Sequence, residues 1–164
     1  MKLVIQRVKR ASVSVDNAVV GECGAGLMLL LGVAEGDTKE DADLLAKKTL
    51  NLRIFTDDAD KMNLSVRDVG REALIVSNFT LLASYRKGNR PDYMQAAAPA
   101  LANELYEYFV SLIAAELDHV GKGRFGAHME IDMTADGPVT IVMDSEVLRP
   151  KRKEEGAPLC ARKE

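Results

Sequence analysis

Two short stretches of this chain hold the residue types from which a reaction could be built. Ser77-Asn78-Phe79-Thr80-Leu81 sets three hydrogen-bonding side chains and an aromatic ring directly after the apolar run 73–76. The second stretch, Asp136-Gly137-Pro138-Val139-Thr140, places a carboxylate directly before a Gly-Pro peptide bond. Such groups can position a substrate and donate hydrogen bonds to a developing oxyanion, without needing a strong base. Taken alone, the first stretch is also typical of a plain strand end, because Thr and Phe favour strands and Ser and Asn favour turns.

Familiar metal, nucleophile and cofactor patterns are missing from the sequence. The two histidines, His119 and His128, stand apart without HExxH spacing, and the only two cysteines, Cys23 and Cys160, are too widely separated for a zinc pattern or a disulfide framework. A Gly-x-Gly-x-x-Gly spacing over 121–126 lies late in the chain without a βαβ context, so we interpret it as chance or a turn. We therefore expect neither a metal nor a cofactor.

Length and composition exclude several classes of protein. A chain of 164 residues with 47% apolar residues is typical of one globular domain. The net charge of −3 argues against a broad nucleic-acid footprint, so any RNA contact should be local. The apolar run 27–34 is too short to cross a bilayer, and the segment 1–7 meets a charge before a signal peptide could develop. We expect a cytoplasmic protein that does not contact membranes.

The order of predicted elements favours an α+β fold. Alternating or continuous apolar residues predict strands, and apolar stripes at helical spacing predict a first helix capped by Asp37 or Thr38 and a longer second helix over 96–117. The expected strands cover parts of 3–20, 27–33, 53–55, 62–66, 73–81, 120–124, 128–133 and 139–143. We predict a single domain over 1–145 with a strongly curved, barrel-like sheet and two main helices, followed by a flexible charged tail over 146–164.

A cluster of basic residues occupies the loop predicted over 84–92. Arg86, Lys87 and Arg90 stand near Gly88 and Pro91. Such a cluster is most often a solvated surface loop, and its functional alternative is contact with phosphates.

Taken together, these motifs resemble D-aminoacyl-tRNA deacylase, a family whose signatures are Ser-Gln-Phe-Thr-Leu and Asn-x-Gly-Pro-Val-Thr. The resemblance runs from Met1 to about Asp144, and the chain departs from the signatures at Asn78, where the family has Gln, and at Ala135, where it has Asn. Further matches are Gln6-Arg7-Val8, Ala11-Ser12-Val13, Gly26-Leu27, Gly32-Val33, Arg53-Ile54-Phe55, Lys61-Met62-Asn63-Leu64, Gly88, Arg90-Pro91, 106–109, 123–126 and Met129.

The resemblance implies a homodimer that binds the acceptor end of tRNA, with its active site at the subunit interface. The Gly137-Pro138 bond is expected to be cis and to enter the partner's pocket. There its carbonyls would face the α-carbon of the aminoacyl group, so an L-side chain collides with rigid backbone while a D-side chain, or glycine, is accommodated. The reaction is hydrolysis of the ester between a D-amino acid and the terminal adenosine of tRNA.

The resemblance also implies which residues form the site, in a catalytic set and a substrate-binding set. The catalytic set is Ser77, Phe79, Thr80, Gly137 and Pro138. The substrate-binding set is Arg7, Met62, Asn63, Asn78, Arg86, Lys87, Arg90, Asp136 and Val139. Arg7 is expected to brace the proline turn across the interface, and the adenine to lie near Phe79.

The role of Thr80 stays open between two mechanisms. Thr80 is the candidate nucleophile by residue type, yet the motif holds no His or Lys to activate its hydroxyl. We favour a mechanism in which the 2′-hydroxyl of tRNA assists, backbone N–H groups of Ser77, Phe79 and Thr80 bind the oxyanion, and the Thr80 side chain positions water or substrate. Two alternative functions stay open: a non-catalytic RNA-binding module, and a related deacylase that removes L-amino acids from mischarged tRNA.

Overall fold

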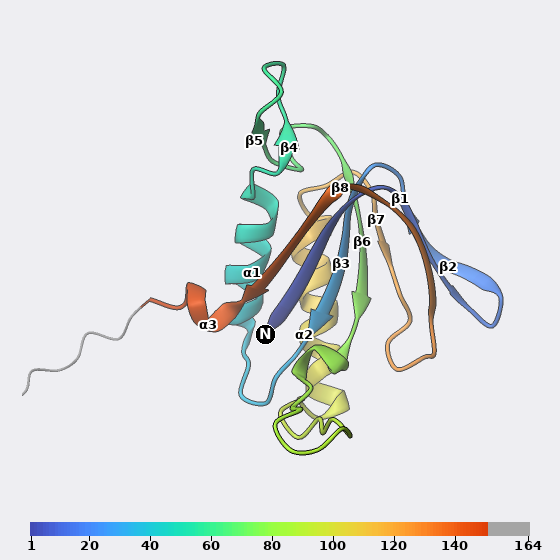
Figure 1. Ribbon diagram of the computed structural model, residues 1–164, viewed down its shortest axis with the longest axis vertical. Coiled ribbons are helices and arrows are strands. Elements are labelled where there is room, and N and C mark those ends of the chain that lie inside the picture. The colour runs from blue at the N-terminus through green and yellow to red at the C-terminus, as the bar shows by residue number, and fades with distance from the viewer. Residues whose placement is uncertain (151–164) are drawn as a thin grey trace, which may run out of the picture.

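The architecture is a strongly curved mixed sheet with both main helices on one face. The computed structural model describes residues 1–150, and the sheet and helices are visible in Figure 1. The strands of the main sheet are β1 (Lys2–Val15), β2 (Ala18–Cys23), β3 (Gly26–Gly32), β6 (Glu72–Ser77), β7 (Val120–Lys122) and β8 (Glu130–Asp144). β4 (Phe55–Thr56) and β5 (Met62–Leu64) form a separate small hairpin.

The strand order is β2-β1-β3-β6-β7, with β8 paired to β1. β1 is antiparallel to β2, β3 and β8, whereas β3, β6 and β7 run parallel to one another. Parallel neighbours need a crossover connection, and the two long helices lie in those connections. The carboxyl ends of β3 and β6 therefore meet at one edge of the sheet.

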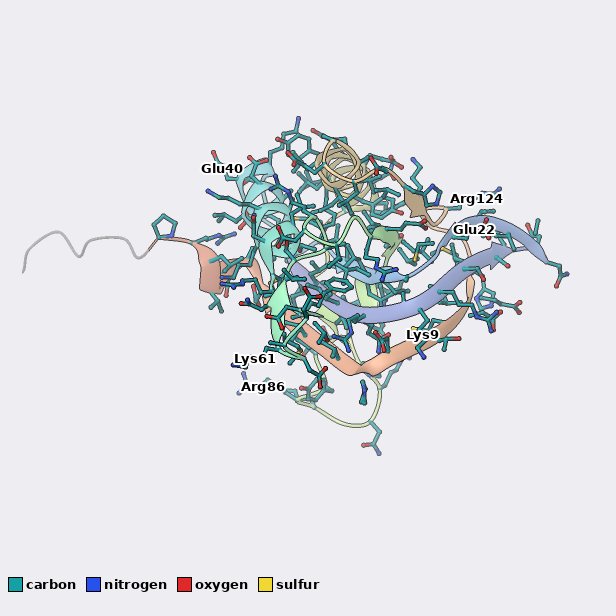
Figure 2. All side chains as sticks on the ribbon, turned by 90° about the horizontal axis from the view of Figure 1, so that it is seen from above. Lys9, Glu22, Glu40, Lys61, Arg86 and Arg124 are labelled. Atoms are coloured by element: carbon teal, nitrogen blue, oxygen red, sulfur yellow. The ribbon has the colours of Figure 1, made fainter. Side chains whose placement is uncertain are left out.

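The helices are α1 (Lys39–Asn51) and α2 (Pro99–Ala114). α1 begins after Thr38, one of the two residues expected to cap it, and a capping box forms there: the Thr38 N–H donates to the Asp41 carboxylate at 3.0 Å. Figure 2 shows both helices on the same side of β1 and β8. Between the helices and the sheet lies the main core, which includes Leu3, Ile5, Leu29, Leu45, Ile75, Tyr106 and Phe109.

Two glycines let the sheet curl until β2 approaches β7. A Cβ placed on Gly21 would lie 2.3 Å from the Lys122 carbonyl oxygen, and one on Gly121 would lie 2.3 Å from that of Glu22. No other residue fits such a close backbone approach. The concave side is filled by a second apolar cluster that includes Val8, Val13, Met28, Leu74 and Val76. The prediction of a barrel-like sheet in a single α+β domain is confirmed.

Three segments differ from the expected elements. The strands expected over 128–133 and 139–143 are parts of one strand, β8, which continues through a bulge. α2 begins only at Pro99, because a residue that precedes proline disfavours the helical conformation. The predicted flexible tail is wrong for its first residues: α3 (Ser145–Leu148) is helical, and Arg149 donates to both carboxylate oxygens of Asp41 at 2.8 and 2.9 Å. The remainder of that tail, 151–164, lies outside the described residues.

No helix within residues 1–150 has the length and apolar character needed to cross a membrane.

Candidate active site

The Ser77 to Leu81 stretch lies where two parallel strands end. Ser77 is the last residue of β6 and pairs with Leu31 of β3, and the chain then turns into the short 3₁₀ helix η1 (Phe79–Leu82). The Asn78 N–H donates to the Leu31 carbonyl at 2.7 Å, which ties this turn to the sheet. Crevices at the carboxyl ends of parallel strands are common ligand sites, because loops and backbone N–H groups converge there.

A cavity of about 870 Å³ opens beside this stretch. Its volume falls within the range of roughly 300–1,000 Å³ that is usual for small-molecule sites. The walls are mostly apolar, and Ser77, Asn78, Phe79 and Thr80 supply polar groups and a ring at one side. Other residues that line it are Leu30, Val76, Tyr93, Ala97, Pro99, Tyr106, Phe125, His128, Met129 and Ile131.

Aromatic side chains shape the cavity. Phe79 remains 59% exposed, and its ring meets that of Tyr93 edge-on at 5.1 Å between centroids. Tyr106 is fully buried and its hydroxyl donates to the carbonyl of Ile75 at 2.9 Å, and burial raises the pKa of Tyr106 above its ordinary value. The exposed ring of Phe79 offers a surface on which a planar base could rest.

Hydrogen bonds of Asn78 and Thr80 leave the backbone N–H of Phe79, which lies between them, without a partner in the described part of the chain. The Asn78 side-chain oxygen accepts from the Thr80 N–H at 3.1 Å and from the Thr80 hydroxyl at 2.5 Å. The Phe79 N–H has no hydrogen-bond partner among residues 1–150. In this conformation Asn78 occupies the Thr80 N–H, one of the three N–H groups expected to bind the oxyanion.

The second motif forms a bulge in β8. Gln6 pairs with Thr140 and Val8 with Ala135, so the four residues Asp136 to Val139 stand opposite Arg7 alone. Unequal numbers of residues push the longer strand out of the ladder. The Gly137-Pro138 peptide bond is cis, as the resemblance implies, and both residues are exposed.

Arg7 holds this bulge from within the same chain. Its Nε lies 3.0 Å from a carboxylate oxygen of Asp136 and donates to the Asp136 carbonyl at 3.3 Å, while Nη1 donates to the Ile54 carbonyl at 2.6 Å. The Arg7 side chain is only 12% exposed, so these charge-assisted bonds are partly shielded from water. Arg7 thus contacts Asp136, next to the proline turn, within its own chain, and its expected role across an interface stays a prediction.

Met62 and Asn63 lie on the β4–β5 hairpin. Met62 is 60% exposed, and Asn63 is held by Arg53, whose Nε donates to the Asn63 carbonyl at 2.7 Å and whose Nη2 donates to its side-chain oxygen. Figure 1 places this hairpin at the opposite end of the molecule from η1. Since Arg7 also contacts Ile54, next to β4, the hairpin and the β8 bulge form one neighbourhood, separate from the cavity.

The basic loop stands at the η1 end of the molecule. Ser84 and Asp92 exchange backbone hydrogen bonds of 2.8 and 2.9 Å that close the loop, and Tyr93 follows directly at the cavity wall. Arg86, Lys87 and Arg90 are exposed, with no ion pair recorded for them within the described part of the chain, and Figure 2 places Arg86 on the outside of the ribbon.

The cavity walls contain residues that sequence reasoning did not assign to the site. Tyr93, Tyr106, Phe125 and Met129 come from three distant segments, and only the fold brings them together. Some lay within stretches that matched the family, but nothing in their spacing marked them as lining a cavity. Within residues 1–150 there is no group of three or more His, Cys, Asp or Glu side chains placed to hold a metal ion.

A preformed cavity with convergent hydroxyl, amide and backbone N–H groups, at the edge of a curved α+β sheet, is characteristic of an enzyme that acts on a bound small group. The family model of D-Tyr-tRNA(Tyr) deacylase matches residues 4–144. The chain belongs to this family of enzymes.

Relatives named D-aminoacyl-tRNA deacylase support the assignment. The protein of Dehalococcoides mccartyi is 55% identical over 145 residues, which cover 88% of this chain and 95% of the relative. That of Caldicellulosiruptor saccharolyticus is 52% identical over 146 residues, covering 89% and 98%. A solved structure described as c-Myc DNA Unwinding Element Binding Protein is 38% identical with a TM-score of 0.83, covering 88% of this chain and 98% of that one. A second, described as a probable eukaryotic D-amino acid tRNA deacylase, is 18% identical with a TM-score of 0.73, covers 87% and 97%, and shares the fold.

Proposed function

We propose that this protein hydrolyses the ester bond that joins a D-amino acid to the terminal adenosine of tRNA. Water adds to the ester carbonyl carbon, the bond to the ribose oxygen breaks, and that oxygen leaves with a proton, so the products are free D-amino acid and tRNA. The observation that carries the proposal is the cavity beside Ser77 to Thr80, with an unused Phe79 N–H, in a chain of the deacylase family. The enzyme would work where charged tRNA is used, in the cytoplasm.

The two motifs are proposed to meet across a homodimer interface. No residue of the bulge 136–139 lines the cavity of its own chain. The bulge lies instead with the β4–β5 hairpin, while η1 lies at the other end of the molecule (Figure 1) and supplies Phe79 and Thr80 to the cavity lining. A site that uses both motifs therefore needs a second copy, and two-fold dimers supply the same pair of surfaces twice.

Chiral selection is proposed to follow from the rigidity of the bulge. Arg7 holds Asp136 by its carboxylate and its carbonyl, so the adjoining Gly137-Pro138 unit is braced on one side. A braced backbone facing the α-carbon would reject an L-side chain by collision, and its rejection would not extend to glycine. Glycyl-tRNA is accordingly a second expected substrate.

The chemistry is proposed to rely on positioning rather than on a protein nucleophile. The Phe79 N–H would stabilise the oxyanion, the Phe79 ring would contact the adenine, and the 2′-hydroxyl of tRNA would assist the attack of water. The Thr80 hydroxyl has only Asn78 as a hydrogen-bond partner within the described chain, and an amide oxygen is no general base for it. Phosphates next to the terminal adenosine would contact the basic loop.

The deciding experiment is deacylation of D-Tyr-tRNA, L-Tyr-tRNA and Gly-tRNA by the purified protein under identical conditions. Rapid cleavage of the D and glycyl substrates with slow cleavage of the L substrate is expected. Preferred cleavage of L-Tyr-tRNA would favour a deacylase for L-amino acids on mischarged tRNA. Binding of all three without cleavage would leave a non-catalytic RNA-binding module.

A further inference from the structure

Asn78 contacts Thr80 twice, through a single oxygen. That oxygen accepts the Thr80 N–H at 3.1 Å and the Thr80 hydroxyl at 2.5 Å. The backbone N–H of Asn78 is itself anchored on Leu31 of β3 at 2.7 Å. The Asn78 side chain therefore links the rigid end of the sheet to the first turn of η1.

These bonds decide which groups of the motif can still interact with a ligand. The N–H groups of Asn78 and Thr80 are occupied, whereas that of Phe79 is free within residues 1–150. Because the Thr80 hydroxyl donates its proton to Asn78, its oxygen can only accept a further hydrogen bond. Among Asn78, Phe79 and Thr80, the free backbone donor is therefore the Phe79 N–H, and the Thr80 oxygen is a hydroxyl acceptor at the wall of the cavity.

We propose that Asn78 is a positioning residue: its side-chain oxygen holds the Thr80 hydroxyl as a hydrogen-bond acceptor and withdraws the Thr80 N–H, which leaves the Phe79 N–H as the oxyanion donor of the turn. This deepens the proposed hydrolysis of D-aminoacyl-tRNA and rests on it. It also gives the departure from glutamine at this position a physical consequence. An asparagine side-chain oxygen accepts a hydrogen bond from the N–H two residues ahead and so closes a compact hydrogen-bonded ring. The additional methylene of glutamine would enlarge that ring.

The substitutions that test this are Asn78→Ala, which removes the acceptor, and Asn78→Asp, which keeps an oxygen in place. Thr80→Ala and the Asn78→Ala/Thr80→Ala double variant complete a cycle. Asn51→Ala is a matched control, because Asn51 is exposed at the end of α1, away from the cavity. Two readouts are needed: amide hydrogen exchange at Phe79 and Thr80 by NMR, and kcat and KM on D-Tyr-tRNA.

The Thr80 amide should be protected in the unmodified protein and in Asn78→Asp, and should exchange roughly fivefold faster or more in Asn78→Ala, the equivalent of one neutral hydrogen bond. Asn78→Ala should lower kcat by roughly fivefold to tenfold with little change in KM. In the Thr80→Ala background the same change should lower kcat by a smaller factor than in the unmodified enzyme, because the hydroxyl that Asn78 holds is already gone and only the backbone N–H at position 80 remains for it to occupy.

Two results would overturn the proposal: a Thr80 amide that exchanges as fast as the Phe79 amide in the unmodified protein, or kcat losses that simply multiply in the double variant. Should the protein cleave none of the aminoacyl-tRNAs, the proposed function fails, yet the exchange experiment still decides whether Asn78 holds Thr80.

Discussion

Gly32 lies at the end of β3 directly beneath η1, and replacing it by alanine should disturb the active site more than the fold. A Cβ at this position would lie 2.5 Å from Cδ2 of Leu82 and 3.0 Å from the Asn78 carbonyl oxygen. The first distance falls about 1 Å short of the ~3.5 Å at which carbon atoms make favourable contact. Leu82 is only 2% exposed and has little room to retreat. We therefore expect Gly32→Ala to push η1 away from the sheet by several tenths of an ångström.

The expected losses of stability and of catalytic activity in Gly32→Ala differ in size. Overpacking of this kind costs about 1–3 kcal/mol of unfolding free energy. A displacement of up to 1 Å at the Phe79 N–H should lower single-turnover deacylation by roughly tenfold to a hundredfold. Gly24→Ala is the matched control, because a Cβ there meets nothing closer than the Glu72 side chain at 3.4 Å.

Urea unfolding and single-turnover deacylation of D-Tyr-tRNA by both variants are the measurements. The reasoning is refuted if Gly32→Ala cleaves its substrate within about threefold of the rate of Gly24→Ala, since positioning of η1 would then not limit the reaction.

Three further outcomes are expected. Burial alone would raise the pKa of Asp41, but hydrogen bonds from Arg149, Thr38 and Ser145 lower it below its ordinary value. The ionised carboxylate should therefore stabilise the fold fully above pH ~3.9, and this stabilisation should be lost as the pH falls below that value. In urea titrations the excess unfolding free energy of the unmodified protein over Asp41→Asn should shrink between pH 6 and pH 3, and a constant difference would contradict this. Replacing Arg86, Lys87 and Arg90 by alanine should weaken tRNA binding and reduce the slope of log affinity against log salt by roughly two to three. As a control, alanine at the ion-paired Lys39, Arg67 and Lys122 should leave that slope unchanged. If the two triple variants show the same slope, the loop is ordinary solvated surface. In single-turnover assays, the unmodified enzyme should cleave a D-aminoacyl-tRNA ending in 2′-deoxyadenosine poorly, and Thr80→Ala should retain substantial activity on the normal substrate. Full activity on the deoxy substrate together with an inactive Thr80→Ala enzyme would favour a covalent Thr80 intermediate.

Local features of the fold were accessible from the sequence because they depend on neighbouring residues. The strand that ends at Ser77 and the capped start of α1 each rest on a few consecutive side chains. The length of β8 was not predicted, because Gly137-Pro138 is typical of a break between strands. In the structure β1 pairs with β8 on both sides of that break, and the mismatch is absorbed by the bulge opposite Arg7.

The candidate site was predictable in its motifs but not in its walls. The parallel arrangement of β3, β6 and β7 is a long-range property that a pattern of apolar residues does not specify. That arrangement brings Tyr93, Tyr106 and Met129 around Ser77. The role of Asn78 was also beyond the sequence, because an amide next to a catalytic motif is as consistent with substrate binding as with a bond to Thr80.

The separation of the two motifs within one chain links the fold to the proposed selectivity. Arg7 bonds to Asp136 and Ile54, so the bulge is fixed to β1 and to the segment before β4, and it cannot fold back onto the cavity of its own chain without breaking these bonds. The cavity in turn is fixed by Asn78 and Leu31 at the far end of the sheet. Two rigid elements that meet only on association would make rejection of an L-side chain a property of the dimer, because neither element can yield to the collision. An Arg7→Ala variant should therefore dimerise and still cleave D-Tyr-tRNA, but cleave L-Tyr-tRNA faster than the unmodified enzyme does. Unchanged discrimination between the two substrates would show that the bulge needs no brace.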